Sequence, residues 1–149
     1  FDQNMGSMYP FSLAEKLRAI TEDHEFYHET NQGGLPWQKP VVPLEMISVL
    51  TQCTSGLSGY RSRGPAVGLF AGQEIKLING PIFVDHPYKL EREIVALSES
   101  KRTESNWIKT RVIDEASDEL VAEVILNSAT LKESYEKYEE DARALGLNL

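Results

Sequence analysis

The segment from Leu44 to Tyr60 constrains the fold more than any other part of the chain, because it combines a helical pattern with almost no charge. Glu45 is its only charged side chain. Apolar or small side chains recur at helical spacing and two glycines end the run: Ile47, Leu50, Thr54 and Leu57, with Met46 and Cys53 beside them, then Gly56 and Gly59. A helix that is apolar nearly all round is buried on most sides, so the rest of the chain must wrap it.

The residues after this helix have the patterns of β-strands. We expect strands over 66–78, 88–97 and 106–113, and a fourth strand in which Leu120, Ala122, Val124 and Leu126 share one face. Turn sequences separate them, Asn79-Gly80-Pro81 and the polar run from Glu115 to Asp118. A capping box, Ser12 with Glu15, begins a short first helix over 13–22. The order predicts an α+β domain in which a curved antiparallel sheet wraps a central helix.

Length and composition favour one domain, over residues 9–134. The 149 residues are too few for two stable cores, and 41% hydrophobic with 26% charged residues is typical of folded chains. Residues 1–8 include Met5-Gly6-Ser7-Met8, which indicates a cloning remnant or a disordered N-terminus more than a signal peptide. Residues 135–149 are predicted to be a charged tail or helix.

Charge and cysteine content exclude several classes of function. A net charge of −8 argues against a duplex nucleic-acid binder, which needs a basic face. The apolar runs are much shorter than the roughly 20 residues that span a bilayer, so we expect no membrane segment. Cys53 is the only cysteine, which indicates a reducing compartment and a cytoplasmic location. We expect its thiol to pack in the core and not to act as a nucleophile.

Two sequence motifs then resemble those of the MaoC-like hot-dog family, which includes (R)-specific enoyl-CoA hydratases and related dehydratases. Gly34-Leu35-Pro36, Pro40-Val41-Val42-Pro43 and Met46 resemble the family's loop leading into its central helix. Gly80-Pro81-Ile82-Phe83-Val84, with Tyr88 after it, resembles a strand entry of the family, with Asp85-His86 where Gly-Asp is usual. The likeness extends over residues 12–132 and implies a hot-dog fold and a hydro-lyase acting on an acyl thioester.

The resemblance also implies catalytic roles for Asp23 and His28. The family's motif is Gly-Asp-x-Asn-Pro-x-His, and Glu22, Glu25 and Phe26 stand here at its glycine, asparagine and proline. An Asp/His pair supplies the base and the acid that hydration of a conjugated thioester requires. Five residues along a helix leave two side chains about 140° apart, so the pair converges only if the helix breaks between them. Solvated histidines at a helix end remain the alternative, and action by His24 or His86 is a weaker hypothesis.

The beginning of the central helix is a second candidate site. Backbone N–H groups there lack intrahelical partners, so those of Leu44, Glu45 and Met46 are able to polarise a thioester carbonyl. An ordinary helix start with Pro43 in its first turn is an equal alternative. Glu45 on the central helix also resembles the carboxylate of some hot-dog thioesterases, for which burial would favour a general base. A carboxylate favoured by the helix dipole is the preferred interpretation.

Partners and remaining ligands complete the sequence prediction. Arg102 is a candidate contact for the carrier, coenzyme A or acyl carrier protein, although a solvent-facing hairpin is its simpler interpretation. The three histidines and one cysteine lack the spacing of a zinc site, and we expect no metal or cofactor. An exposed sheet edge predicts a homodimer with sites near its interface. An acyl thioester hydrolase and a non-catalytic hot-dog protein that binds a ligand or a partner remain open.

Overall fold

The computed structural model describes residues 11–19, 24–28, 36–60 and 64–147. Three α-helices, three short 3-10 helices and four strands form in this part of the chain: α1 (Leu13–Arg18), Glu25–Tyr27, α2 (Leu44–Gln52), Ser55–Ser58, β1 (Gly68–Leu77), β2 (Tyr88–Glu99), β3 (Thr103–Asp114), β4 (Leu120–Leu131), Lys132–Ser134 and α3 (Tyr138–Ala144). All four expected strands are present, and three of them are longer than the sequence patterns predict. None of the described helices is long and apolar enough to cross a membrane.

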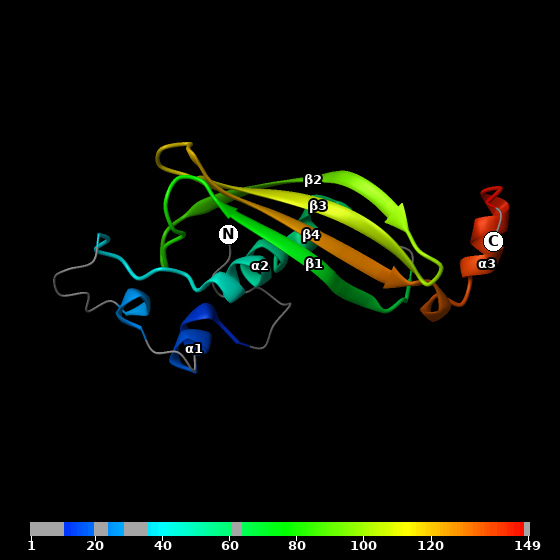
Figure 1. Cartoon of the computed structure of the whole chain (residues 1–149), viewed down its shortest axis with the longest axis horizontal. Coiled ribbons are helices and arrows are strands. Elements are labelled where there is room, and N and C mark those ends of the chain that lie inside the picture. Colours follow the sequence, from blue (N-terminus) through cyan, green and yellow to red (C-terminus); the bar gives the residue numbers. More distant parts are fainter. Residues whose placement is uncertain (1–10, 20–23, 29–35, 61–63, 148–149) are drawn as a thin grey trace. The chain divides into compact units, whose positions relative to one another are not determined.

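The strands form one sheet in the order β1-β4-β3-β2 (Figure 1). Tight turns join β2 to β3 and β3 to β4, which makes these pairs antiparallel. The N–H of Ile78 donates to the carbonyl of Val121, and the N–H of Leu131 donates to that of Val67, so β1 runs antiparallel to β4 as well. β1 and β2 are therefore the two edges of the sheet.

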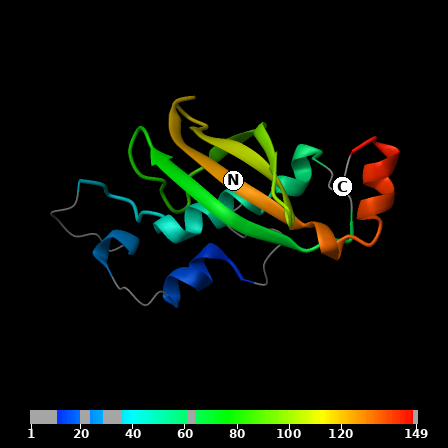
Figure 2. The same cartoon turned by 45° about the vertical axis from the view of Figure 1, so that its right-hand side comes forward.

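The residues divide into two compact units. Unit 1 comprises residues 1–60, 75–92 and 110–124, and it contains α1 and α2. Unit 2 comprises residues 61–74, 93–109 and 125–149, and it contains α3. In Figures 1 and 2, α1 lies beside α2 in unit 1.

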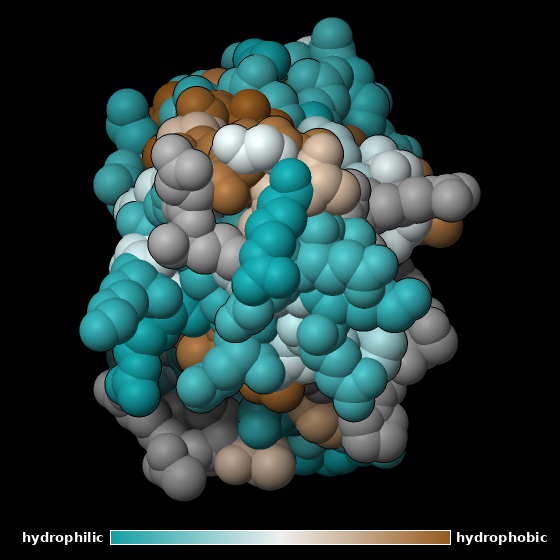
Figure 3. Space-filling view, turned by 90° about the vertical axis from the view of Figure 1, so that its right-hand side faces the viewer, coloured by the Kyte–Doolittle hydropathy of each residue, from teal (hydrophilic) through white to brown (hydrophobic). Residues whose placement is uncertain are grey.

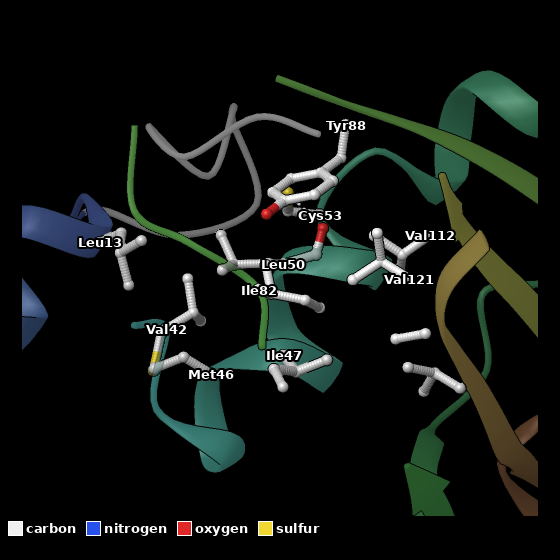
Figure 4. Close-up of a cluster of buried hydrophobic side chains, with 12 residues drawn as sticks. Leu13, Val42, Met46, Ile47, Leu50, Cys53, Ile82, Tyr88, Val112 and Val121 are labelled. Carbon is white, nitrogen blue, oxygen red and sulfur yellow. Dashed lines mark hydrogen bonds between the residues drawn. The ribbon is translucent and has the colours of Figure 1, made fainter. Parts of the chain in front are cut away.

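The hydrophobic core lies in unit 1 around α2. It combines both helices with the loop before α2 and the strand residues of this unit (Figure 4): Leu13, Val42, Met46, Ile47, Leu50, Cys53, Ile82, Tyr88, Val112, Val121, Ala122 and Val124. The prediction that this mostly apolar helix is buried is confirmed. The Sγ of Cys53 is buried and donates to the carbonyl of Leu50 at 3.3 Å, as expected for a core thiol.

α2 ends earlier than the sequence pattern predicts. The helix stops at Gln52, and a 3-10 turn over Ser55–Ser58 continues to Gly59, whose φ of 73° is in the left-handed region. Gly56 lies inside the expected helix, where a glycine is conformationally costly. The first helix is also shorter than expected: the capping box of Ser12 and Glu15 forms, but α1 ends at Arg18, and residues 20–22 lie outside the described part.

Arg92 of β2 fixes the C-terminal end of α2. Its Nε and Nη2 atoms donate to the carbonyl of Thr51 at 3.2 and 2.5 Å. Nη2 also donates to Thr54 Oγ1 at 2.7 Å, and Nη1 donates to Ser58 Oγ at 3.1 Å. Partial burial lowers the pKa of Arg92, yet a guanidinium remains charged at any ordinary pH. A cation therefore faces the negative end of the helix dipole.

Unit 2 leaves large apolar side chains exposed along both sheet edges. In its part of β1 and the residue before it these are Val67, Leu69 and Phe70, and in its part of β2 they are Ile94, Val95 and Leu97. The tail after β4 forms the predicted charged helix, α3. The face that carries α3 is mostly hydrophilic, with small hydrophobic areas (Figure 3).

Candidate functional site

The predicted Asp23/His28 pair is described only in part, because Asp23 lies outside the described residues. His28 is exposed and ends the 3-10 turn Glu25–Tyr27, where its N–H donates to the carbonyl of Glu25 at 3.3 Å. His24 is extended, with φ −133° and ψ 141°, and its Nδ1 accepts from the N–H of Phe26. The backbone over residues 24–28 is therefore not a continuous α-helix. A break of this kind is the condition for the side chains of Asp23 and His28 to converge.

The first turn of α2 has two exposed residues and one buried residue. Leu44 is 58% exposed and Glu45 is exposed, whereas Met46 is buried in the core. The N–H of Met46 donates to the carbonyl of Pro43 at 2.9 Å. The N–H groups of Leu44 and Glu45 are therefore the better donors for a ligand carbonyl.

Glu45 does not have the burial that a thioesterase base was expected to use. Its side chain is exposed at the start of α2, where the helix dipole favours a carboxylate. The simpler interpretation of Glu45 as a helix-start carboxylate agrees with this position.

Arg102 belongs to unit 2 and lies in the turn between β2 and β3. It is exposed, as the hairpin interpretation predicts. The cavity of about 540 Å³ beside it has a balanced lining of three cations and three carboxylates: Lys101, Arg102, Lys132, Glu133, Glu136 and Glu139, with Tyr135 and Tyr138. A lining without excess positive charge is a weak attractor for the phosphates of a carrier.

A histidine and an aspartate that the sequence analysis did not pair meet in unit 1. His86 Nε2 forms a hydrogen bond with Asp114 Oδ2. Asp114 Oδ1 accepts from the N–H groups of Ala116 and Ser117 at 2.7 and 2.9 Å. The N–H of Ser117, followed by the His86 side chain, holds the pKa of Asp114 at about 2, below its ordinary value of 3.8. Asp114 is thus a fixed carboxylate.

This pair lines a cavity of about 350 Å³ in unit 1. Trp37, Phe83 and Tyr88 contribute aromatic walls, and Lys39 places an ammonium at its lining. Lys39 Nζ lies 3.3 Å from His86 Nδ1, and the rings of His86 and Tyr88 are 4.9 Å apart. Burial raises the pKa of Tyr88, whose hydroxyl accepts from the N–H of Phe83 at 2.9 Å. Acid–base, cationic and aromatic groups converge on this space.

No group of three or more His, Cys, Asp or Glu side chains suited to a metal ion occurs among the described residues. The cavity therefore combines acid–base groups without a metal-ligand cluster in the described part of the chain.

Comparisons with known proteins identify the fold. No protein-family model and no curated protein sequence matches the chain. Two solved structures are similar to this chain. The first is a C-terminally truncated HadBC complex, a 3R-hydroxyacyl-ACP dehydratase from Mycobacterium tuberculosis, with a TM-score of 0.63 and 18% identity over 78% of this chain and 83% of that one. The second is a MaoC-like dehydratase, with a TM-score of 0.64 and 16% identity over 80% of this chain.

The chain spans only 37% of the length of that MaoC-like dehydratase. At these identities the likeness concerns the fold, and the predicted α+β hot-dog architecture is confirmed. The resemblance of short motifs to MaoC-like proteins is thus supported by the path of the backbone over 78–80% of this chain.

Proposed function

We propose that this chain is a hydratase or dehydratase that interconverts 2-enoyl and 3-hydroxyacyl thioesters carried by coenzyme A or acyl carrier protein. The backbone likeness to two dehydratases carries the proposal. The exposed start of α2 adds to it, because the N–H groups of Leu44 and Glu45 are placed to receive a carbonyl oxygen as negative charge develops on it.

Asp23 and His28 are the proposed acid–base pair of this reaction. In hydration one group takes a proton from water while the other protonates the α-carbon, and dehydration reverses both transfers. The extended backbone at His24 supports the pair, since an unbroken helix would hold the two side chains apart.

The test is a spectroscopic assay with crotonyl coenzyme A, which follows loss of the conjugated absorbance and release of free thiol. The intact protein should consume the conjugated bond, and Asp23→Asn or His28→Gln should lower kcat by about 10²-fold or more. His24→Gln, an exposed histidine outside the proposed pair, is the matched control and should retain activity. Thiol release that both variants retain would instead indicate a thioester hydrolase. If the intact protein changes neither the conjugated absorbance nor the free thiol, a non-catalytic partner protein is indicated.

A homodimer is the proposed assembly, formed through a sheet edge of unit 2. Phe70 on β1 is 59% exposed, and Leu69 and Val67 are exposed close to it in the sequence. Unpaired edges with apolar side chains are commonly covered by another chain. Light scattering at micromolar concentration should give twice the chain mass, and Phe70→Lys should give a monomer.

The control for this experiment is Leu145→Lys, at an exposed leucine just after α3. It adds the same charge away from the strand and should leave the dimer intact. A monomeric intact protein would contradict the homodimer and favour assembly with a different hot-dog chain.

A further inference from the structure

The His86–Asp114 pair has a defined direction, because its carboxylate cannot rotate freely. Asp114 lies at the end of β3, and both N–H groups that donate to its Oδ1 belong to the following turn. Oδ2 is left to face His86 Nε2. The carboxylate therefore holds the imidazole ring at a fixed orientation, as the aspartate does in hydrolytic triads.

Lys39 defines which ring nitrogen carries the proton. An ammonium group only donates hydrogen bonds, so His86 Nδ1 accepts from Lys39 Nζ across their 3.3 Å separation. The proton of the neutral ring is then on Nε2, where it is donated to Asp114. This tautomer leaves the basic lone pair on Nδ1, beside a positive charge.

The surroundings are suited to a reacting ligand and not only to a structural hydrogen bond. The side chains of His86 and Asp114 keep 18% and 19% of their surface exposed, so a ligand is able to reach them. Phe83 and Tyr88 flank the ring, and both line the same cavity of about 350 Å³. Lys39 is exposed and has a long, flexible side chain, so it is able to leave Nδ1 for a ligand oxygen.

We propose that His86, oriented by Asp114, is a general base that removes the α-proton of an acyl thioester, with Lys39 stabilising the enolate. In this step the α-C–H bond breaks and its proton moves to His86 Nδ1. The bonding electron pair forms a carbon–carbon double bond, and the carbonyl π-electrons move to oxygen. The imidazolium then faces the Asp114 carboxylate, and the enolate oxygen faces the Lys39 ammonium.

This assignment rests on the proposed substrate class, and it makes His86 an alternative to the Asp23/His28 pair for the transfer of the α-proton. Its test therefore uses butyryl coenzyme A, which has no 3-hydroxyl group to eliminate. In D₂O the intact protein should exchange the α-protons of this thioester for deuterium, observed as loss of their proton NMR signal. His86→Gln should slow the exchange by about 10²-fold or more, because it removes the base.

Two further variants distinguish a loss of catalysis from a loss of folding. Lys39→Met changes an exposed side chain and should slow exchange while the thermal unfolding curve stays unchanged. Asp114→Asn should slow exchange by favouring the other tautomer of His86. His24→Gln and Lys89→Met are the matched controls outside the cavity and should exchange at the rate of the intact protein.

The outcomes distinguish this proposal from the proposed function. If the intact protein exchanges the α-protons but does not dehydrate 3-hydroxyacyl thioesters, the result would support His86 as the base and refute the proposed hydratase activity. Dehydration without exchange, or exchange that His86→Gln and Lys39→Met leave unchanged, would overturn the assignment of His86. Exchange that is lost in Asp23→Asn but retained in His86→Gln would overturn it too, by placing the base at Asp23.

Discussion

Leu50→Ala is expected to lower the free energy of unfolding by about 2–5 kcal/mol. Leu50 lies in the middle of α2, is fully buried, and belongs to the core of unit 1. Truncation removes apolar contacts and leaves a cavity, because the helix and the strands cannot collapse around one missing side chain without moving. Urea unfolding followed by circular dichroism measures the change.

The matched control is Leu57→Ala, the same substitution at a side chain that is 87% exposed. Its expected change is less than about 0.5 kcal/mol, since few contacts are lost at the surface. Equal effects at the two positions would show that α2 is not the buried centre of unit 1.

Asp114→Ala is expected to cost about 1–3 kcal/mol at neutral pH. The substitution leaves the N–H groups of Ala116 and Ser117 without their acceptor and removes the hydrogen-bond partner of His86. Because the carboxylate is charged in these contacts, each is stronger than a hydrogen bond between neutral groups.

The cost of Asp114→Ala should depend on pH in a defined window. The pKa of Asp114 is about 2 in the folded protein, against an ordinary value of 3.8. A lowered folded-state pKa means that the stabilisation is complete above about pH 4 and is lost as the pH falls through about 2. Urea unfolding from pH 7 to pH 2 should show the gap between intact protein and variant closing below pH 4. Glu115→Ala, at an exposed carboxylate of the same turn, should show no such closing. A gap that stays constant to pH 2 would contradict the role of this carboxylate.

Hydrophobic periodicity was enough to predict the architecture. The stretch that begins at Leu44, with Glu45 as its only charge, required a covering layer, and the alternation of Leu120, Ala122 and Val124 supplied part of it. The limits of the helices were harder to predict. The end of α2 depends on Arg92, which is distant in sequence and whose effect on Thr51 no local pattern reveals.

The His86–Asp114 pair was missed because its members are 28 residues apart and the motif that contains His86 does not include Asp114. The register between β2 and β3 contains the information that would have paired these two residues. The pairs Glu91–Arg111 and Glu93–Lys109 lie across β2 and β3, and continuing that pairing brings Tyr88 opposite Asp114 and His86 close to it. Charged pairs on the exposed strand face were predictable, but register follows only once the turn near Ser100 is fixed.

The contact of Arg92 with Thr51 makes the central helix dependent on a strand formed much later in the sequence. α2 has nine residues, fewer than an isolated helix needs to persist in water. The carbonyl of Thr51 near its end gains a cationic partner only when β2 is in place. During synthesis the residues of α2 therefore leave the ribosome about forty positions before their stabilising partner, so the helix and the sheet must form in one cooperative event.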